Sequence, residues 1–386
     1  MASDLPRFVV ATPARSVCDD NARALERAGL LRLLALGTRR GTTGVSMKRT
    51  RLNPAIGLAT YFFGRFLSMY WGEYCRFRLH RWFDRWAKRQ LLPGDHIISS
   101  YGYANSCFRW VRKHGGHTFV DGGNSHPENF WSIISEEHRR WDCPYPPVAR
   151  HHHERSLAMM EDVDFVLSPS KFVTQSFLKR GFRPEQIIRN VYPLDLSCFT
   201  PPANPRPKDR PLTIITTGTL TLRKGSPYLL QAFRIILRSE PMARLRLIDS
   251  VTDSMKPVLA KFGDLPIDWT PPLPHPQLAE RLHGADIFVL PSLEDGFART
   301  IAEALACGLP VITTPNTGAS DLIVPSQNGE VVPIRDPQAI ADAVLTWWDR
   351  IRREGNAGIQ FDKSVLDFEH FAGDFLGQLR ERDLLT

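Results

Sequence analysis

The strongest constraint on the fold of this chain is the alternation of apolar and polar segments between Ala285 and Asp321. Residues 286–291 form a short apolar run that ends at a proline, as expected of a parallel strand covered on both faces. Residues 299–307 have the composition of a helix, and a glycine and a proline then stop it. Residues 310–314 supply a second strand. This order of strand, loop, helix and strand predicts an α/β domain with a parallel sheet.

Two acids in this region are spaced so that both can face one crevice. Asp295 lies at the helix entrance, and Glu303 follows eight positions later, a little over two turns at about 3.6 residues per turn. Each has an ordinary explanation, since Asp295 could be a helix N-cap and Glu303 a solvated helix acid. The polar loop 317–321 follows the second strand, however, and open α/β sheets bind ligands at adjacent loops of this kind. We therefore predict a polar ligand held by Asp295 and Glu303.

A second site element lies upstream. The β-branched run 212–217 leads into a loop that contains Arg223, Lys224 and Gly225, and a helical stretch begins near Tyr228. Two cations and a glycine before a helix make a seat for phosphate, because charge, backbone N–H groups and helix dipole act together. A pair of solvated loop cations is the ordinary alternative. The loop lacks P-loop spacing, which argues against nucleotide hydrolysis by that route.

Together these residues resemble the fourth family of retaining glycosyltransferases, the glycosyl transferases group 1. The family pattern is an acid-Gly-Phe-Gly turn, a glutamate eight positions after the acid, and then Ala-x-Ala-x-Gly-x-Pro-Val-Ile. In this chain it reads Asp295, Gly296, Phe297, Ala298, Glu303, Ala304, Ala306, Gly308, Pro310, Val311 and Ile312. The triplet 223–225 resembles the family's phosphate-binding segment, and segment 120–127 resembles one whose histidine lies beside the donor sugar. The resemblance implies the GT-B fold, in which two Rossmann-like domains with parallel sheets face a central cleft.

The resemblance also implies a reaction and a role for each matched residue. A glycosyl group would pass from a nucleotide-diphospho-sugar to an acceptor with retention of configuration, without a metal or cofactor. Arg223 and Lys224 would neutralise the departing diphosphate. Asp295 would bind sugar hydroxyls, Glu303 would bind the ribose, and His126 would reach the donor sugar from the first domain unless it is an ordinary polar loop histidine. The remaining donor-binding residues would be Gly218, Thr219, Gly296, Phe297 and Ala298.

The chain departs from the family pattern at three places. Asp295 stands where glutamate is usual and is one methylene shorter, and Thr219 stands where many members carry arginine. Residues 8–16 replace the glycine-rich loop that often follows the first strand. These departures motivate one alternative, a non-catalytic nucleotide-sugar-binding protein on a degenerate transferase fold. Another GT-B enzyme, such as a sugar-nucleotide epimerase or a phosphorylase, is the second alternative.

The length of 386 residues predicts two domains with separate cores. The clearest boundary is the segment 200–211, which is too rich in proline for a helix or a central strand. We expect an acceptor-side domain over residues 1–199 and a nucleotide-sugar-binding domain over residues 212–360. The resemblance implies that the C-terminal helix, residues 361–386, packs back on the first domain.

Charge is divided unevenly along the chain. Residues 1–200 hold 29 Lys+Arg and 18 Asp+Glu, a net charge of +11, which leaves −3 for the remainder of a chain with net charge +8. Residues 61–89 interleave aromatic side chains with cations, which is the composition of a helix at an anionic membrane surface. A core-packing helix with snorkelling cations is an equal alternative. Single-stranded nucleic acid ranks third because no nucleic-acid module accompanies this segment, and we expect no nucleic-acid partner.

Three further patterns bear on location and chemistry. The N-terminal residues 1–15 lack a secretory apolar region, and the six cysteines lack C-x-x-C spacing, which predicts reduced thiols. The consecutive residues His151–His153 would point in different directions on a helix, so we predict no metal site. We expect a cytoplasmic enzyme of polysaccharide or glycolipid biosynthesis that could be peripheral at the membrane. Its acceptor would be a glycan or a lipid-linked molecule.

Overall fold

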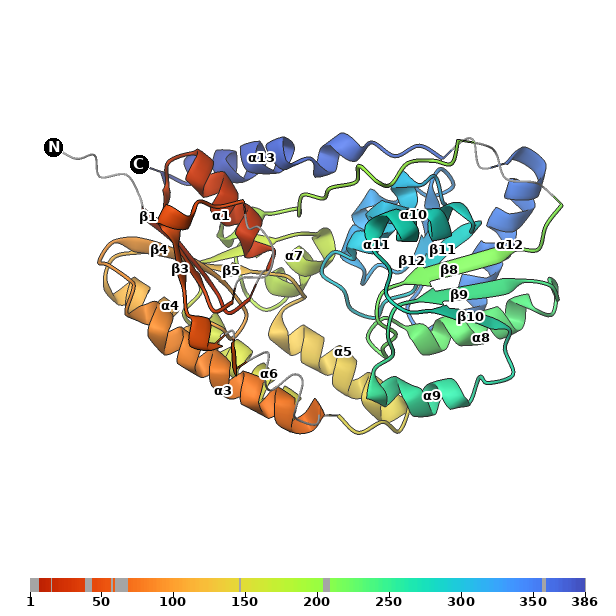
Figure 1. Ribbon diagram of the computed structural model, residues 1–386, viewed down its shortest axis with the longest axis horizontal. Helices are drawn as coiled ribbons and strands as arrows, with labels where there is room; N and C mark the ends of the chain where they lie inside the picture. The colour runs from red at the N-terminus through yellow and green to blue at the C-terminus, as the bar shows by residue number, and fades with distance from the viewer. Residues whose placement is uncertain are drawn as a thin grey trace.

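The computed structural model describes residues 7–14, 16–38, 44–56, 58–59, 69–145, 147–203, 209–355 and 359–385, without the side chains of residues 69–73, 76 and 147. Within these ranges the chain forms two α/β lobes that lie side by side (Figure 1). Each lobe is built on its own parallel sheet.

The first lobe contains a sheet of seven parallel strands, counted over the described residues, in the order β3-β2-β1-β4-β5-β6-β7. The strands are β1 (Arg7–Thr12), β2 (Leu31–Leu36), β3 (Thr50–Leu52), β4 (Asp95–Ser100), β5 (Thr118–Asp121), β6 (Phe165–Ser168) and β7 (Ile187–Arg189). The helices of this lobe are α1 (Cys18–Arg27), α3 (Met69–Lys88), α4 (Asn105–Lys113), α5 (Pro127–Arg140), α6 (Pro147–Met160) and α7 (Lys171–Leu178).

The second lobe contains six parallel strands within the described ranges, in the order β10-β9-β8-β11-β12-β13. The strands are β8 (Thr213–Thr217), β9 (Arg244–Ile248), β10 (Ile267–Thr270), β11 (Ile287–Leu290), β12 (Val311–Thr313) and β13 (Gly329–Val331). The helices of this lobe are α8 (Ser226–Ile236), α9 (Lys256–Ala260), α10 (His275–His283), α11 (Arg299–Ala306) and α12 (Pro337–Glu354). Single 3₁₀ turns are η1 (Met47–Arg49), η2 (Pro184–Gln186), η3 (Asp253–Met255), η4 (Gly318–Leu322) and η5 (Lys363–Leu366).

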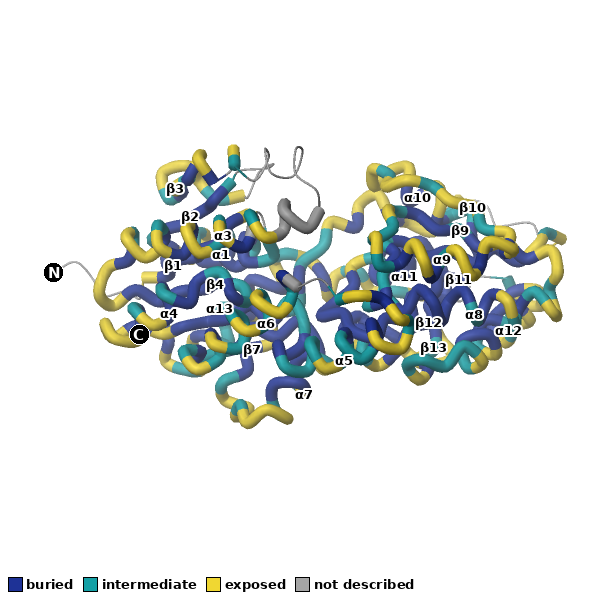
Figure 2. Tube along the Cα trace, turned by 90° about the horizontal axis from the view of Figure 1, so that it is seen from below, coloured by how far each residue is buried: buried dark blue, intermediate teal, exposed yellow. Residues whose placement is uncertain are grey.

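The strands are apolar on both faces because helices cover both faces of each sheet. In β1, Val9 and Ala11 join the core that contains Phe83 of α3, while Phe8 and Val10 join the opposite core under α1. The second sheet likewise has one core under α8 and α12 and another under α10 and α11. Buried segments accordingly run through the middle of each lobe in Figure 2. The two parallel sheets confirm the predicted fold class.

Both sheets reverse their strand order beside the first strand of the lobe. In the first sheet the reversal lies between β1 and β4, and in the second it lies between β8 and β11. Loops that leave such neighbouring parallel strands in opposite directions open a crevice at the carboxyl edge of the sheet. Each lobe therefore has one built-in place for a ligand.

Two segments pass between the lobes. The proline-rich segment lies between β7 and β8, although its residues 204–208 are outside the described residues. The last helix, α13 (Phe368–Glu381), returns to the first lobe, where it packs on α1 and β7 (Figure 1). Phe375 is fully buried there, and Gln378 Nε2 donates to the Arg189 carbonyl at 2.8 Å.

Helix α5 is a further link between the lobes. Glu137, near its C-terminal end, is fully buried and accepts hydrogen bonds from Tyr228 Oη at 2.7 Å and Arg335 Nε at 2.9 Å. Just beyond the helix, the Cys143 thiol donates to the Ser254 carbonyl at 3.2 Å. Tyr228, Arg335 and Ser254 all belong to the second lobe. The C-terminal end of α5 is therefore anchored outside the lobe in which the helix begins.

The predicted membrane-surface segment 61–89 is only partly described. Residues 61–68 lie outside the described residues, and α3 covers most of the remainder. Over the ranges that the structure describes, no helix combines the length and the apolar content needed to cross a bilayer.

Candidate active site

The predicted phosphate seat lies between the carboxyl ends of β8 and β11. Gly225 caps helix α8 with φ of 67°, and a Cβ atom on it would lie 1.9 Å from the carbonyl oxygen of Pro291. Glycine is required here because any side chain would push the loop away from β11. The close approach holds Arg223 and Lys224 beside the loop that follows β11.

Each of these two cations is paired with an acid of the β11 loop. Lys224 Nζ forms an ion pair with Asp295 Oδ2, and Arg223 Nη1 lies 3.2 Å from Glu294 Oε2. Arg223 also donates to the main-chain carbonyl of Glu294 at 2.9 Å. The two acids are buried, so screening by water is weak at this site. The site is a compact cluster of two cations and two carboxylates.

The cluster shifts the pKa values of its members in different directions. Burial raises the pKa of Asp295, but Lys224 and Arg223 outweigh it and hold that pKa below its ordinary value. Burial prevails at Glu294 over the attraction of Arg223, so the pKa of Glu294 lies above its ordinary value. Burial lowers the pKa of Arg223, but Asp295 and Glu294 more than offset this effect. Asp295 is therefore the carboxylate held most firmly in its charged form.

The loop of this cluster also touches the first lobe. The backbone N–H of Ser125 donates to Glu294 Oε1 at 2.8 Å, and Ser170 Oγ donates to the Gly296 carbonyl at 2.9 Å. A Cβ atom on Gly296 would lie 2.1 Å from the carbonyl oxygen of Gly123. Glycine at position 296 thus lets two backbones from different lobes meet.

The predicted sugar-binding turn forms the entrance of α11. Ala298 caps the helix in the left-handed region, with φ of 63°. The Phe297 N–H donates to Asp295 Oδ1 at 3.3 Å, and its ring packs edge-on against Tyr192, with 5.8 Å between ring centroids. Within the described ranges, the N–H groups of Gly296 and Ala298 donate to no protein acceptor. A helix entrance leaves such N–H groups without an intrahelical partner, whereas the Phe297 ring is packed against Tyr192.

The other predicted donor-binding residues lie around this cluster. Glu303 is on α11 and only 9% exposed; burial raises its pKa, and the charges of His275 and Arg299 offset this in part. Gly218 follows β8 with φ of 104°. The Thr219 hydroxyl lies 3.3 Å from Asp249 Oδ1, in the loop after β9. Thr219 is therefore directed toward β9, whereas Glu303 lies along the helix that begins at the cluster.

His126 directly follows Ser125, which contacts the charged cluster, but its own ring contacts other groups. Its Nδ1 accepts a hydrogen bond from the Glu128 N–H at 3.2 Å, which makes it the N-cap of α5. Its ring packs edge-on against Phe177, with 5.1 Å between centroids, and it is only 5% exposed. Burial, with a smaller effect from Arg180, lowers the pKa of His126 to about 4. The geometry gives this histidine a capping and packing role, and the sugar contact that the family resemblance implies stays a prediction.

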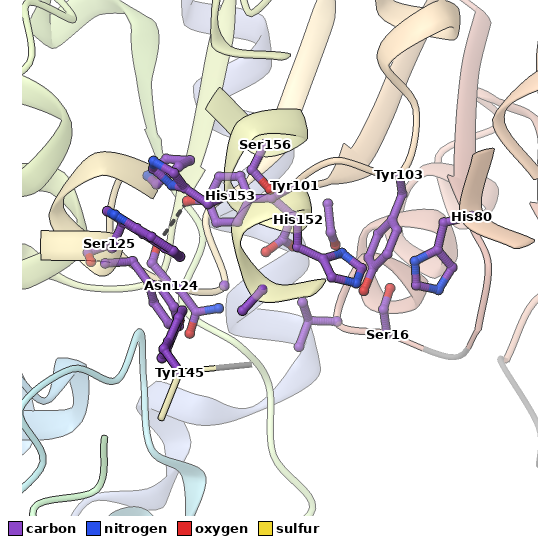
Figure 3. A pocket seen from close by; sticks show the side chains of 18 residues that line it. Ser16, His80, Tyr101, Tyr103, Asn124, Ser125, Tyr145, His152, His153 and Ser156 are labelled. Atoms are coloured by element: carbon purple, nitrogen blue, oxygen red, sulfur yellow. Dashed lines mark hydrogen bonds between the residues drawn. The ribbon is translucent and has the colours of Figure 1, made fainter. Parts of the chain in front are cut away.

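A cavity of about 730 Å³ opens at the carboxyl edge of the first sheet (Figure 3). Loops after β1, β4 and β5 contribute to it, as do α3, α5 and α6. Its aromatic lining includes Tyr101, Tyr103, Trp131, Tyr145, His152 and His153. Such side chains combine an apolar face with a polar edge, which suits a ligand that carries both C–H surfaces and hydroxyl groups.

The cavity and the charged cluster share a wall, formed by Gly123, Asn124 and Ser125. All three line the cavity, and Gly123 and Ser125 are the residues that meet the β11 loop. Tyr101 Oη donates to the Asn124 carbonyl at 2.8 Å, the dashed line in Figure 3, and so fixes this wall from the β4 side. Only the segment 123–125 would separate a ligand in the cavity from the charged cluster.

Asp121 lies on the floor of the cavity. Its Oδ1 accepts a hydrogen bond from Tyr192 Oη at 2.7 Å, and its Oδ2 lies 3.7 Å from the Cys18 thiol. Burial raises the pKa of Asp121 to about 6, although both hydrogen bonds oppose the shift. Both carboxylate oxygens are engaged, so Asp121 acts as a structural brace between β5 and the segment before the second lobe.

Of the three consecutive histidines, His151 and His152 both contact the Phe77 ring, and His153 contacts another ring. His152 packs edge-on against Phe77, with 5.0 Å between centroids, and His153 stacks on Trp131 at 4.7 Å. In the part of the chain that the structure describes, no three His, Cys, Asp or Glu side chains are grouped to hold a metal ion.

The sequence analysis did not predict several of these residues to be part of the site. Glu294 could have been found, because it directly precedes Asp295 at the end of a predicted strand. The aromatic lining of the cavity carries no local signal, since its members come from segments that are far apart in the chain.

The sequence comparisons agree with this site. Residues 211–350, which hold the charged cluster, match the family described as glycosyl transferases group 1. The chain is 29% identical over 161 residues to a D-inositol 3-phosphate glycosyltransferase of Thermomonospora curvata, which covers 38% of this chain and 36% of that protein. It is 27% identical over 197 residues to a putative colanic acid biosynthesis glycosyltransferase of Salmonella typhimurium, which covers 49% of this chain and 48% of that protein. The chain thus spans about half or less of the length of these curated relatives.

Solved structures match over nearly the whole chain. Sucrose-phosphate synthase from Thermosynechococcus elongatus has a TM-score of 0.63 at 18% identity, which covers 98% of this chain and 99% of that chain. A structure described as trehalose-6-phosphate from E. coli bound with UDP-2-fluoro glucose has a TM-score of 0.63 at 15% identity, over 97% of this chain and 99% of that chain. At this level of identity the likeness establishes the fold. Residues 211–350 thus match the glycosyl transferases group 1 family, and the chain has the GT-B fold.

Proposed function

We propose that this protein transfers a glycosyl group from a nucleotide-diphospho-sugar to an acceptor hydroxyl in the first-lobe cavity. One observation carries the proposal: the cluster of Arg223, Lys224, Glu294 and Asp295 stands at the strand-order reversal of one sheet and shares a wall with the cavity of the other. A charged leaving group and a hydroxyl-bearing acceptor would meet at that wall. The names of the relatives, and the UDP-2-fluoro glucose bound to one structural neighbour, support this class of donor.

The chemistry follows from the charges of the cluster. The bond between the anomeric carbon and the diphosphate oxygen breaks, and a bond from the acceptor oxygen to the same carbon forms. Arg223 and Lys224 neutralise the charge that grows on the diphosphate. When Lys224 turns to the phosphate, Asp295 becomes free to accept hydrogen bonds from sugar hydroxyls. Glu303 holds the ribose hydroxyls.

The stereochemical course that we propose is retention. Among the described residues that line the cavity, Asp121 alone carries a carboxylate, and Tyr192 engages it. The acceptor therefore attacks on the face from which the diphosphate leaves, and the acceptor proton passes to a leaving-group oxygen. The positive charge of Arg223 and Lys224 supports this step without a cofactor.

The acceptor that we propose is a glycan or a lipid-linked sugar of a polysaccharide or glycolipid pathway. Aromatic faces such as Trp131 and Tyr145 suit the C–H surface of a sugar ring, and serine, asparagine and histidine side chains of the cavity suit its hydroxyls. Relatives named for colanic acid and amylovoran biosynthesis support this class of product.

The first test combines thermal unfolding and product analysis. The purified protein is heated with a panel of nucleoside diphosphates and nucleotide-sugars, since a ligand that binds the folded state raises Tm. We expect one diphosphate nucleotide to raise Tm selectively. In Lys224→Ala this ligand-induced shift should be lost, measured against the variant's own Tm, and turnover should fall at least about 100-fold. The control is Lys256→Ala, whose exposed lysine pairs with Asp253 and forms no part of the cluster.

Other outcomes assign the protein to another class. An isomerised nucleotide-sugar without transfer would identify an epimerase, and a sugar phosphate formed with inorganic phosphate would identify a phosphorylase. Selective binding without turnover would support the non-catalytic alternative, for which Asp295 and Thr219 are the motivating residues. If Lys224→Ala kept full turnover in a folded protein, the phosphate assignment would be wrong.

A further inference from the structure

Helix α3 has two faces of opposite character. The inner face packs on the first lobe with Phe77, Phe83 and Ala87 buried. Among the described side chains of α3, the outer face carries exposed cationic and aromatic residues only: Tyr74, Arg78, Arg81, Trp82, Arg85 and Lys88. At about 100° per residue these positions fall on one stripe of roughly 120°. The described part of α3 is therefore an amphipathic helix whose solvent face is cationic and aromatic rather than mixed in charge.

The cations of this stripe are not neutralised. Within the described residues, Arg78, Arg81, Arg85 and Lys88 form no ion pair, and neither does Arg89 just beyond the helix. Some other exposed arginines of the lobe form ion pairs, for example Arg109 with Asp162 and Arg150 with Glu154. The acid inside this stretch, Asp84, is buried and pairs inward with Arg155. As far as the described residues go, the outer face of α3 and Arg89 thus present five positive charges without an ion-pair partner.

Two aromatic side chains stand among these charges. Trp82 is 43% exposed and Tyr74 is 36% exposed. Cations that merely snorkel from a packed helix would leave aromatic residues on its inner face, as Phe77 and Phe83 are. Exposed Trp and Tyr beside Lys and Arg are instead typical of a surface at the boundary between lipid and water, where the amphipathic ring reaches the headgroup level.

The other face of α3 reaches the cavity. His80 lines the cavity and packs edge-on against Tyr103, with 4.7 Å between centroids. Phe77 contacts His152, another residue of the cavity lining. Figure 3 shows His80 and Tyr103 at one end of the cavity. A surface bound by the outer face of α3 would therefore lie one helix diameter from the cavity.

We infer that the outer face of α3 docks on an anionic lipid bilayer. Charge complementarity selects the partner, because each Lys or Arg near an anionic lipid surface strengthens binding about fivefold, and this face offers five. Trp82 and Tyr74 select a bilayer over a purely ionic partner, since their rings partition into the headgroup region. The docking would hold the cavity beside the membrane. The inference does not depend on the donor chemistry, because the charged cluster lies elsewhere in the fold.

The test is cosedimentation of the full chain with two kinds of vesicle. One kind is pure phosphatidylcholine, and the other contains about a third phosphatidylglycerol. We expect binding to the anionic vesicles, weakened by salt, and at least tenfold weaker binding to the neutral ones. The variant Arg78→Glu/Arg85→Glu should bind the anionic vesicles at least 100-fold more weakly, and Trp82→Ala several-fold more weakly.

A matched control distinguishes binding through the outer face of α3 from a general effect of net charge. Arg238→Glu/Arg281→Glu makes the same change in charge at exposed positions of the second lobe, and its vesicle binding should fall far less than that of the α3 variant. Equal losses in the two variants, or equal binding to neutral vesicles, would overturn the inference. So would tighter binding to a single-stranded oligonucleotide that the α3 variant loses.

A second readout keeps docking and proposed function distinguishable. The α3 variant should keep the Tm increase caused by the nucleoside diphosphate that stabilises the unmodified protein, because α3 contributes nothing to the charged cluster. Failure of all nucleotides to stabilise the protein would contradict the proposed function while vesicle binding stood. If the α3 variant lost both vesicle binding and stabilisation by nucleotide, it would be misfolded. The binding of Trp82→Ala to anionic vesicles, expected to be several-fold weaker, would then decide the question.

Discussion

Ala298 stands where the family pattern has glycine, and its backbone still adopts the conformation that glycine prefers. Its φ of 63° lies in the left-handed region, at the entrance of α11 and beside Asp295. A side chain in this region costs about 1–2 kcal/mol relative to the right-handed conformation. The turn keeps the geometry of the family despite the substitution, so the strain is stored next to the ligand site.

Ala298→Gly should therefore stabilise the protein. We expect the free energy of unfolding to rise by up to about 1 kcal/mol, because strain is relieved while a small buried methyl group is lost. Thermal unfolding measures the change. The control is Ala302→Gly in the interior of α11, which should lower Tm because glycine weakens a helix. A lower Tm in Ala298→Gly would contradict the strain argument.

Neutralising Glu303 is expected to raise the stability of the ligand-free protein and to lower its affinity for the nucleotide. Burial raises its pKa, so at pH 8 the charged carboxylate destabilises the folded state, and this effect disappears as pH falls below that raised pKa. Glu303→Gln should raise Tm at pH 8 but weaken nucleotide binding about tenfold, since a charged acceptor for the ribose is lost. Calorimetric titration measures the second effect. Glu280→Gln on α10, an exposed position, should change neither quantity.

At the scale of elements, helix α5 connects the two lobes through its ends. His126 caps its start beside the shared wall, and Glu137 anchors its other end to Tyr228 and Arg335 of the second lobe. A helix tied at both ends transmits displacement as a rigid body, because bending it would break its internal hydrogen bonds. Movement of one lobe would therefore shift the wall between Gly123 and Ser125.

The start of α5 should weaken in acid. The neutral form of His126 is favoured in the fold, so stability from this group is present above its unfolded pKa of about 6.5 and is lost as pH falls toward its folded pKa of about 4. The full effect is about 3 kcal/mol. His126→Asn keeps a capping side chain but cannot titrate, so its Tm should be lower at pH 8 and approach that of the unmodified protein by pH 4.5.

A comparison within this pH series isolates His126 from other groups. His96, whose pKa burial also lowers to about 4, titrates over the same range in both proteins, so only the difference between them reports on position 126. A difference in Tm that stays constant from pH 8 to pH 4.5 would contradict the assignment. Unchanged turnover at pH 8 would confine His126 to its capping role.

At the scale of the whole molecule, the two lobes meet where glycine backbones touch. The Gly296 loop and the Gly123 loop approach so closely that a single methyl group would separate them. The hydrogen bonds of Glu294 and Ser170 across the same boundary fix the register of the contact. The position of the donor site relative to the cavity therefore depends on this contact.

Gly296→Ala should hold the lobes apart. We expect kcat to fall at least about tenfold, because a displacement of about 1 Å between reacting groups slows catalysis strongly, while nucleotide affinity changes less. Transfer kinetics and X-ray scattering in solution measure the two consequences. Gly373→Ala on the exposed side of α13 has open space for the methyl group and should leave kcat unchanged. Normal kcat in Gly296→Ala would show that the contact does not position the donor.

The local sequence alone was enough to predict several strands, one helix and part of the candidate site. The apolar runs that became β8, β11 and β12 and the helix that became α11 were predicted to within about two residues at their ends, because strand and helix patterns are read over short windows. Arg223 and Asp295 were predicted from their places at the carboxyl ends of strands. The family resemblance predicted that both domains are Rossmann-like.

Only the tertiary structure decided which of these residues meet. The pairing of Arg223 with Glu294, the burial of His126 against Phe177 and the aromatic cavity each join segments that are distant in the chain. Residue types and spacing leave such contacts open, because the crossing of helices over a sheet and the approach of two lobes depend on the packing of the whole core. The same packing turned one face of α3 inward to the cavity and left its cationic face exposed.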